Sequence, residues 1–395
     1  MGRPIAQQKA WALGSLFWGR SLADDPKRAK GCLMDSNGQR TSATWKKFLA
    51  FVAFQLGFIV ILFAYIEMSM KTEPGGHDPA TLAYPVDMGF SKLTLLLWTC
   101  PFRKQCHIEN CSKLLGIPEC HITTERSWYP KADAVLIHHR DLHGNPKKLP
   151  KEPRPPSQRW IWLNMESPSN SPNLDSMDNL FNLTMTYRRD SDVYIPYGWM
   201  EVLPQPQNFT IPPKSKLVAW VVSSWKSGSV RVKYYKELKK YIPVDVYGRH
   251  HSPLPWVKQL SMLSQYKFYL AFENSIHEDY ITEKIWRNAF LTWAVPVVLG
   301  PPRKNYERYM PSDSFIHVND FPSAQELAMF LHELDRNTTR YQSYFHWHSW
   351  LKPIRGFWWS FSFCKACQVL QKKPVQFQTI PELSKWFKDG RNLTA

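Results

Sequence analysis

The chain has 395 residues, of which 44% are hydrophobic, and it contains 18 Trp. This length allows two domains with sizeable cores, and the composition excludes a wholly disordered protein. The formal net charge is +17, of which +6 comes from residues 1–47, where nine Lys and Arg stand against three Asp. The remaining cations form no long basic tract, which argues against nucleic-acid binding but leaves a diffuse positive field suited to an anionic ligand.

The first predicted element is a membrane-spanning helix over residues 48–66. These 19 residues carry no charge, and about 20 apolar residues are enough to cross a bilayer as a helix. Lys46 and Lys47 precede the segment, so the positive-inside bias places the N-terminus in the cytoplasm. A cleaved signal peptide is disfavoured because the segment starts far into the chain and lacks a small-residue cleavage site. We expect a cytoplasmic tail at 1–47, a signal-anchor at 48–66, a Pro/Gly-rich stem at 67–90 and a luminal or extracellular remainder.

Two further features are typical of a luminal domain. Glycosylation sequons occur at Asn182, Asn208, Asn337 and Asn392. Six of the seven cysteines follow the predicted span, an even number suited to disulfides. The Cys364-Lys-Ala-Cys367 motif could be a redox pair or half of a zinc site, but no second such motif or His cluster accompanies it, and structural disulfides are favoured.

Apolar runs of strand length and helical patterns alternate along the rest of the chain. The first series has expected strands at 93–98, 134–139, 160–164 and within 183–198. After a Pro-rich break at 204–216, the second series has expected strands at 217–225, 244–248, 268–275, 294–300 and 314–318, with expected helices at 231–242, from Asp279 and at 323–334. This alternation predicts two α/β halves with doubly wound parallel sheets that face a cleft. We place the halves at 91–212 and 213–370, followed by a C-terminal segment at 371–395.

The stretch 272–290, FENSIHEDYITEKIWRNAF, joins a strand end, a polar loop and the first turns of a helix that either Asp279 or Thr282 can cap. In open α/β sheets, ligands bind beyond the carboxyl ends of the strands, where a helix N-terminus offers free N–H groups to an anion. Residues 272–290 are therefore a candidate ligand site.

Two cations stand at strand-to-helix corners of the second half. Lys284 does not complement the helix dipole, which prefers acids at that end, but it fits opposite a diphosphate. The alternative is that Lys284 pairs with Glu283 or another neighbour. Arg231 opens the preceding predicted helix, and two such cations in one crevice are expected for a nucleotide-diphosphate leaving group. The GxGxxG and GxxxxGK[ST] motifs are absent from the sequence, which disfavours a dinucleotide enzyme and a P-loop kinase.

The pattern FENS-x3-DYITEK-x-WRNA resembles the donor-site signature of the α1,3-fucosyltransferases of glycosyltransferase family 10. The resemblance covers roughly residues 93–388 and includes LIHHRD, WIWLNMESP, VPVVLGPPRKNYERYMP and CKACQ. It implies the GT-B architecture of two Rossmann-like domains, GDP-fucose as donor, inversion at the anomeric carbon of fucose, and a single-pass type II protein of the Golgi membrane with a luminal catalytic domain.

The resemblance also implies roles for individual residues. The catalytic base falls on Glu166, which follows a hydrophobic run, and an inverting transfer needs one carboxylate to accept the proton of the acceptor hydroxyl. The alternative for Glu166 is that it caps the loop 167–173. The expected donor-binding residues are Arg231 and Lys284 for the diphosphate, Glu273, Asn274, Tyr280 and Glu283 for guanosine and fucose, and Ser223, beside which Ser224 stands where many relatives have Asn.

The predicted acceptor contacts are His138, His139 and Arg140. The two histidines cannot easily share a metal ion, because consecutive side chains on a strand point to opposite faces. By resemblance, Arg at position 140 goes with α1,3 transfer to type 2 lactosamine, which gives Lewis X or its sialylated form. The expected partners are therefore GDP-fucose and lactosamine-bearing glycoproteins or glycolipids, and a homodimer is a further possibility.

Two other interpretations stay open. Asp190-Ser-Asp192 resembles the DxD by which metal-dependent glycosyltransferases hold Mn²⁺ on a diphosphate, although Arg188 and Arg189 beside it would neutralise its charge. The favoured expectation is that no metal or cofactor is required and that Mn²⁺ at most stimulates. The second interpretation is a catalytically inactive, membrane-tethered glycan-binding module, against which intact Glu166 argues.

The resemblance finally implies how the cysteines pair. It implies that the C-terminal CxxC motif returns to the first domain, with the pairs Cys111–Cys364 and Cys120–Cys367, which leaves Cys100 for Cys106.

Overall fold

The computed structural model describes residues 92–103, 105–356, 359–372 and 377–389, together with Gln55 and Gly57. The predicted tail, stem and sequon at Asn392 lie outside these residues, as does the predicted span apart from those two positions. Within the described part of the chain, no helix has both the length and the hydrophobicity that crossing a bilayer requires. The elements below belong to the compact unit Asp87–Ala395.

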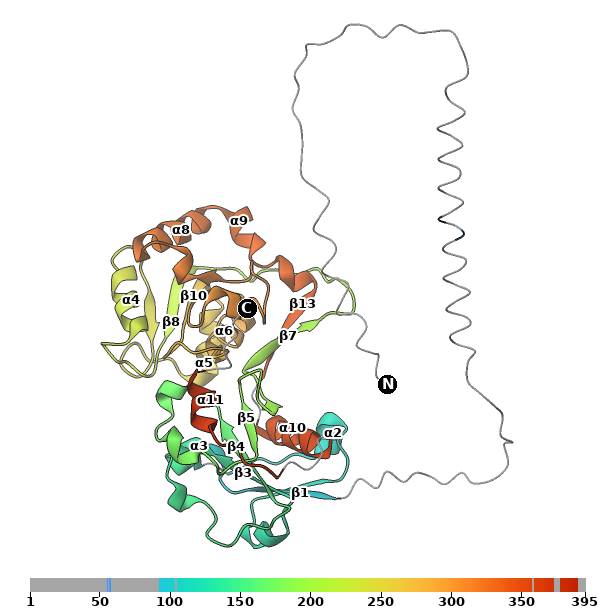
Figure 1. Cartoon of the computed structure of the whole chain (residues 1–395). Coiled ribbons are helices and arrows are strands. Elements are labelled where there is room, and N and C mark those ends of the chain that lie inside the picture. Colours follow the sequence, from blue (N-terminus) through green and yellow to red (C-terminus); the bar gives the residue numbers. More distant parts are fainter. Residues whose placement is uncertain are drawn as a thin grey trace, which may run out of the picture. The chain divides into compact units, whose positions relative to one another are not determined.

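The first half is built on a six-stranded, wholly parallel sheet (Figure 1). Its strands run in the order β2-β1-β3-β4-β5-β6, with the bounds β1 Leu93–Leu97, β2 Cys120–Thr123, β3 Ala134–His138, β4 Arg159–Asn164, β5 Leu183–Thr186 and β6 Val193–Tyr194. Every residue of β1, β3, β4 and β5 is buried, as expected for strands covered on both faces. The helices α2 (Cys111–Leu115) and α3 (His139–Leu142) follow β1 and β3.

The second half is built on a five-stranded parallel sheet of order β12-β11-β10-β8-β9. Its strands are β8 Lys216–Val221, β9 Asp245–Tyr247, β10 Tyr266–Phe272, β11 Val295–Leu299 and β12 Ile316–His317, and its helices are α4 Val230–Leu238, α5 Trp256–Leu263, α6 Glu283–Trp286, α7 Arg303–Tyr306, α8 Ala324–Arg336 and α9 Thr338–Ser343. The strand order reverses between β1 and β3 in the first half and between β8 and β10 in the second half. The prediction of two parallel α/β halves is confirmed.

The helix predicted from Asp279 is much shorter in the structure. Asp279 has a φ of 59°, which helical backbone does not allow. Its carboxylate accepts from the Asn305 amide at 2.8 Å, and its own N–H donates to the same amide oxygen at 2.9 Å. The helix therefore begins only after Thr282, whose hydroxyl donates to Glu273 and makes no capping bond.

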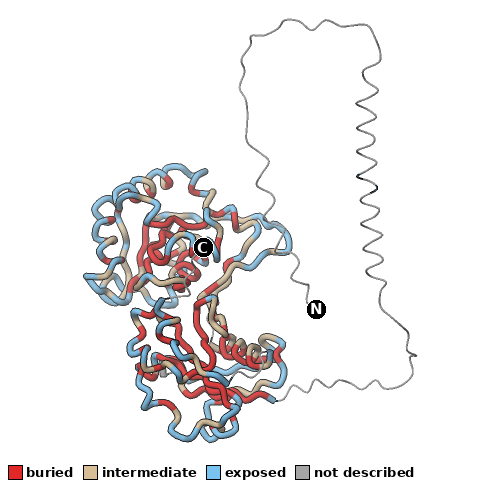
Figure 2. Tube along the Cα trace, in the orientation of Figure 1, coloured by how far each residue is buried: buried red, intermediate tan, exposed pale blue. Residues whose placement is uncertain are grey.

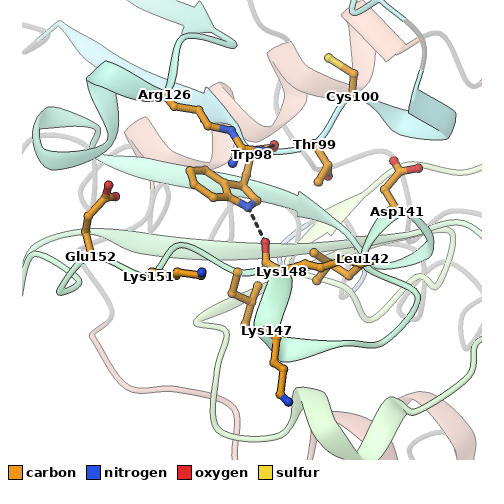
Figure 3. A pocket seen from close by; sticks show the side chains of 11 residues that line it. Trp98, Thr99, Cys100, Arg126, Asp141, Leu142, Lys147, Lys148, Lys151 and Glu152 are labelled. Atoms are coloured by element: carbon orange, nitrogen blue, oxygen red, sulfur yellow. Dashed lines mark hydrogen bonds between the residues drawn. The ribbon is translucent and has the colours of Figure 1, made fainter.

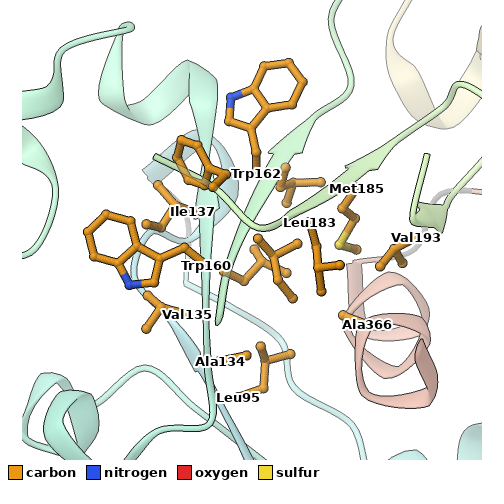
Figure 4. Close-up of a cluster of buried hydrophobic side chains, with 14 of the residues drawn as sticks. Leu95, Ala134, Val135, Ile137, Trp160, Trp162, Leu183, Met185, Val193 and Ala366 are labelled. Atoms are coloured by element: carbon orange, nitrogen blue, oxygen red, sulfur yellow. The ribbon is translucent and has the colours of Figure 1, made fainter. Parts of the chain in front are cut away.

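An antiparallel ribbon and the C-terminal helices were not predicted in their places. Strands β7 (Gly198–Val202) and β13 (Leu351–Arg355) pair as a two-stranded ribbon. After this ribbon come α10 (Trp359–Lys372) and α11 (Leu383–Asp389), which pack on the core of the first half. Figure 2 colours the buried residues of this core red. Figure 4 shows Ala366 of α10 facing Leu183, Met185 and Val193. The limit of the second half predicted at residue 370 therefore differs from the structure, because the chain returns to the first half before that point.

Three disulfides pair Cys100 with Cys106, Cys111 with Cys364, and Cys120 with Cys367. These are the pairs that the resemblance implies. The last two join α2 and β2 to α10, so they fasten the returning C-terminal helix to the first half. Cys111, Cys120 and Cys367 have sulfur atoms close enough to hold a metal ion, but all three are in disulfides, so the zinc and redox alternatives for the CxxC motif have no support among the described residues.

One predicted glycosylation site is wrong for the folded protein. Asn182 is buried, and its amide nitrogen donates to the carbonyls of Phe377 and Gln378 at 2.9 and 3.2 Å. Its amide oxygen accepts from the backbone N–H of Trp160. A glycan on this nitrogen would remove the bonds that hold the C-terminal segment, whereas Asn208 and Asn337 are exposed.

We expect the two long-range disulfides to dominate the stability of the first half. Replacing both Cys111 and Cys364 by Ser should lower the free energy of unfolding by roughly 3 kcal/mol, against roughly 2 kcal/mol for Cys100 with Cys106 on the same chain-entropy model. The Cys111–Cys364 separation is 253 residues, but the retained Cys120–Cys367 bridge leaves this pair a loop of only about 15 residues to close. Guanidinium unfolding curves of the two double variants provide the comparison, and equal losses would contradict the expectation.

Candidate active site

A cavity of about 680 Å³ lies at the carboxyl ends of β8, β9 and β10, where the order of the second sheet reverses. Ser223 and Ser224 follow β8, Gly248 follows β9, and Asn274 follows β10; all four line the cavity. Gly248 has a φ of +131°, and a Cβ there would lie 2.0 Å from the carbonyl oxygen of Val222. Only glycine lets these two strand ends approach and leave the space open.

Arg231 supplies a buried cation to this cavity. It stands in the first turn of α4 and is 5% exposed. Its guanidinium donates to the carbonyls of Ser224 at 2.6 Å and Phe272 at 3.3 Å, while its Nε has no partner. Burial lowers its pKa from the ordinary value. No carboxylate forms an ion pair with Arg231 within the described part of the chain, and Glu273 offsets its charge only from farther away, so an anionic ligand could pair with it directly.

Lys284 lines the same cavity and is held by acids. Its ammonium lies 2.9 Å from a carboxylate oxygen of Glu273 and 3.3 Å from one of Glu283. Burial alone would lower the pKa of Lys284, but the two carboxylates raise it above the ordinary value. The cation is therefore permanent. The structure confirms the alternative in which Lys284 pairs with its neighbours, and the same residue also lines the cavity.

Glu166 lies at the mouth of a second cavity, of about 330 Å³. It follows β4 and its side chain is 25% exposed, which leaves the carboxylate accessible. The guanidinium of Arg140 forms an ion pair with it. Behind Glu166, Tyr197 donates to the Met165 carbonyl at 2.5 Å and fixes the backbone next to the carboxylate. His138 lines this cavity as well.

The two cavities meet at Trp256, Glu283 and Arg287, which line both. The Trp256 ring is 61% exposed, and the guanidinium of Arg287 lies 3.5 Å from its centroid. Arg287 is buried, its Nε has no partner, and burial lowers its pKa. The sequence analysis did not predict either Trp256 or Arg287 as a site residue. Arg287 lies within the quoted WRNA motif, whereas no local pattern marks Trp256.

Polar contacts join the loop of Glu166 to the loop after β10. The Ser275 hydroxyl donates to Ser167 at 2.6 Å, and Ser169 is 2.6 Å from the His277 ring. Asp279 accepts from the backbone N–H of Arg189 at 3.1 Å. The carboxylate at the end of β4 and the cations of the second half are therefore fixed with respect to one another.

Several predicted site residues lie away from the cavities. Glu273 is 2% exposed and accepts from Thr282 as well as from Lys284, so it supports the site from behind. Tyr280 is buried 5.0 Å from the Tyr187 ring and lines neither cavity. His139 donates to the Pro172 carbonyl at 3.0 Å and accepts from Trp162, and burial lowers its pKa to about 4. Direct acceptor contact by His139 is therefore wrong, because its neutral ring is part of the core.

The Asp190-Ser-Asp192 motif is part of the scaffold. The carboxylate of Asp190 accepts two bonds from Arg188 and one from the Trp386 indole. Asp192 accepts from the backbone and hydroxyl of Thr184, both at 2.9 Å. Neither residue lines the Arg231 cavity or the Glu166 cavity, which disfavours the DxD interpretation.

Comparisons with known proteins agree with this geometry. The family model described as "Glycosyltransferase family 10 (fucosyltransferase) C-term" matches residues 211–386, and "Fucosyltransferase, N-terminal" matches residues 91–198. The chain is 48% identical over 362 residues to the 3-galactosyl-N-acetylglucosaminide 4-alpha-L-fucosyltransferase FUT3 of Bos taurus, covering 88% of this chain and 98% of that protein. This chain is a family 10 fucosyltransferase.

Other relatives of the fucosyltransferase include the 4-galactosyl-N-acetylglucosaminide 3-alpha-L-fucosyltransferase FUT5 of Homo sapiens, 47% identical over 363 residues, covering 87% of this chain and 96% of that protein. A solved structure titled as an alpha1,3-fucosyltransferase with GDP-fucose is 16% identical and covers 76% of this chain and 95% of its own, with a TM-score of 0.49. The two family models make the chain a glycosyltransferase, and Arg231 and Glu166 lie within the residues that these models match, 211–386 and 91–198.

We expect Arg231 to contribute strongly to nucleotide affinity. Arg231→Ala should weaken GDP binding roughly ten- to hundredfold, as a lost charge-assisted hydrogen bond of about 1.5 to 3 kcal/mol implies. Titration calorimetry of the full-length chain measures this directly. Lys233→Ala is the matched control, because Lys233 is exposed on the same helix and does not line the cavity. Equal GDP affinities in the two variants, with unchanged unfolding temperatures, would show that Arg231 is only structural.

Proposed function

We propose that the fucosyltransferase moves L-fucose from GDP-fucose to the GlcNAc of type 2 N-acetyllactosamine, neutral or sialylated, through an inverting α1,3 transfer. One observation carries this proposal. The cavity with Arg231 and Lys284 adjoins the cavity with Glu166, because Trp256 and Arg287 line both. We infer that a diphosphate in the first cavity puts its sugar near Glu166, which with Glu283 is one of the two carboxylates lining the second cavity among the described residues.

The proposed reaction assigns a step to each charged group. The acceptor hydroxyl gives its proton to a carboxylate oxygen of Glu166, and its oxygen bonds to the anomeric carbon of fucose. The bond from that carbon to the diphosphate oxygen breaks at the opposite side, and GDP leaves. Arg231 and Lys284 stabilise the charge that develops on the diphosphate, while Arg287 stands at the junction where that charge appears.

The acceptor class rests on the printed names of the relatives and on Arg140. The names of the bovine and human relatives both describe transfer to a galactosylated N-acetylglucosaminide, at position 4 or 3. Arg140 borders the Glu166 carboxylate, where it can contact the sugar that carries the reacting hydroxyl. This placement supports the α1,3 choice that the resemblance implies. The predicted span and the disulfides support a type II Golgi membrane protein with a luminal catalytic domain.

The function is tested by incubating the full-length chain with GDP-fucose and either type 2 or type 1 galactosyl-N-acetylglucosamine. We expect α1,3-fucosylated type 2 product, identified by NMR of the new anomeric proton and the substituted carbon. Faster formation of an α1,4 product on type 1 would reverse the acceptor assignment. GDP binding without any fucosylated product would favour the inactive glycan-binding module.

Glu166→Gln should fold and bind GDP normally, while kcat falls by roughly two to four orders of magnitude, which is the usual contribution of a positioned base. Glutamine keeps the size of the side chain and its contact with Arg140. Glu201→Gln is the control, because Glu201 is exposed on β7 and lines neither cavity. Retention of more than about a tenth of the wild-type rate would remove Glu166 from the role of base.

We further propose that no metal ion is required, because both DxD carboxylates bind protein donors and, among the described residues, five cations line the two cavities: Arg231, Arg249, Lys284, Arg287 and Arg355. Initial rates in EDTA should stay within about threefold of the untreated enzyme, since Arg and Lys clamps supply the charge stabilisation that a metal provides elsewhere. Loss of activity in EDTA that Mn²⁺ restores would contradict this proposal. If Mn²⁺ then failed to restore the activity of Asp190→Asn but restored that of Asp313→Asn, the metal would be located at the DxD motif.

A further inference from the structure

A third cavity, of about 660 Å³, lies at the reversal of strand order in the first sheet (Figure 3). It is bordered by the chain that follows β1, β2 and β3, namely by Trp98, Thr99, Cys100, Arg126, Asp141 and Leu142. The Arg231 cavity occupies the corresponding position between β8 and β10 of the second sheet. In doubly wound sheets this position is where ligands bind, yet the proposed reaction leaves the third cavity without a role.

The cavity has an excess of positive charge. Four cations line it, Arg126, Lys147, Lys148 and Lys151, against the two acids Asp141 and Glu152. Asp141 is already engaged, because one of its oxygens accepts from His138 at 2.7 Å and from the Phe102 N–H at 3.1 Å. None of the four cations is in an ion pair within the part of the chain that the structure describes. The cavity is therefore suited to an anion.

Hydrogen bonds within the protein hold part of this lining in place. The Trp98 indole is buried and donates to the Lys148 carbonyl at 2.9 Å, the bond drawn in Figure 3. The Arg126 guanidinium lies 3.7 Å above the same ring and donates to the Trp98 carbonyl. Asn145 accepts from the Lys147 N–H and holds the start of the lysine segment. A cavity of about 660 Å³ with an ordered guanidinium and three lysines on its wall fits a sugar that bears a negative group better than a bare ion.

The third cavity and the Glu166 cavity share a wall. His138 lines the Glu166 cavity and Asp141 lines the third cavity, and their side chains are directly bonded. Thr99 of the third cavity also accepts from the His138 N–H at 2.8 Å. Between these residues, Arg140 reaches Glu166. The acceptor sugar that reacts would lie at Glu166, on one side of this wall, and the cations lie on the other side. A second sugar linked to the acceptor sugar would therefore need to extend only beyond this wall to reach the cations.

We propose that the third cavity binds the anionic group, a carboxylate or a sulfate ester, of a sugar that extends the acceptor glycan. This inference rests on the proposed function, because it assumes that the acceptor hydroxyl lies at Glu166. It makes the lysine segment a determinant of specificity for acidic acceptors that takes no part in the chemical step.

The test compares three acceptors with one lactosamine core: the neutral disaccharide, the same disaccharide with a carboxylate-bearing sugar on its galactose, and the same disaccharide with a sulfate ester there. The full-length chain is assayed as wild type, as Lys147→Gln/Lys151→Gln, and as the control Lys233→Gln/Lys236→Gln, whose lysines are exposed on α4. We expect KM for the acidic acceptors to rise about three- to tenfold in the first variant alone, with kcat unchanged, because partly exposed charge pairs contribute modestly. The effect should shrink at high salt.

The outcomes separate this inference from the proposed function. No turnover of any acceptor by the wild type contradicts the proposed function itself. Turnover of all three with equal KM changes in both lysine variants, or with no change in either, overturns the inference. A third arm measures inhibition by inorganic phosphate with the neutral acceptor. If Lys147→Gln/Lys151→Gln weakens only this inhibition, the cavity takes a free anion, and the inference is likewise overturned.

Discussion

The site depends on the contact between the loop that carries Glu166 and the loop that follows β10. A carboxylate at the end of one sheet and cations at the end of another can act on the same bond only if the two sheet edges are held in register. The hydroxyl pair of Ser167 and Ser275 and the pair of Ser169 and His277 supply that register. They are short polar contacts, whose geometry is directional, whereas apolar packing between the halves would tolerate small slips. The left-handed backbone of Asp279 turns the chain toward this contact.

The buried charges around the Arg231 cavity follow from the same arrangement. Lys284 is held by Glu273, an acid that is itself almost wholly buried, so neither charge stands alone in a medium of low dielectric. Arg231 and Arg287 form no ion pair within the described residues, although Glu273 and Glu283 offset part of their charge from farther away, and burial lowers the pKa of both. The structure thus contains one cation that a direct ion pair compensates, Lys284, and two buried cations, Arg231 and Arg287, with which an anion could pair.

The two halves share one structural feature, a cavity at the point where the strand order of the sheet reverses. Each sheet reverses its strand order once, and each reversal holds a cavity with cations on its wall. The chain then returns, through the β7–β13 ribbon and α10, to the core in which it began. Two disulfides fasten that return to α2 and β2. The disulfides therefore bind α10 covalently to the first half, and we expect this to steady the wall between the Glu166 cavity and the third cavity.

The amino-acid sequence determined the two parallel sheets, because runs such as those of β3, β4 and β10 are apolar on both faces and alternate with helical patterns. It also placed Arg231, Lys284 and Asn274 at strand-to-helix corners, and these residues do line one cavity. Only the tertiary structure decided that Glu273, Tyr280 and His139 lie behind the site, that Asn182 is buried, and that α10 belongs to the first core. Local patterns show that a side chain is buried or stands at a strand end, but they do not show which distant element covers it. Trp256 and the cations around Trp98 acquire their positions from contacts between segments far apart in the chain, and no spacing along the sequence encodes such contacts.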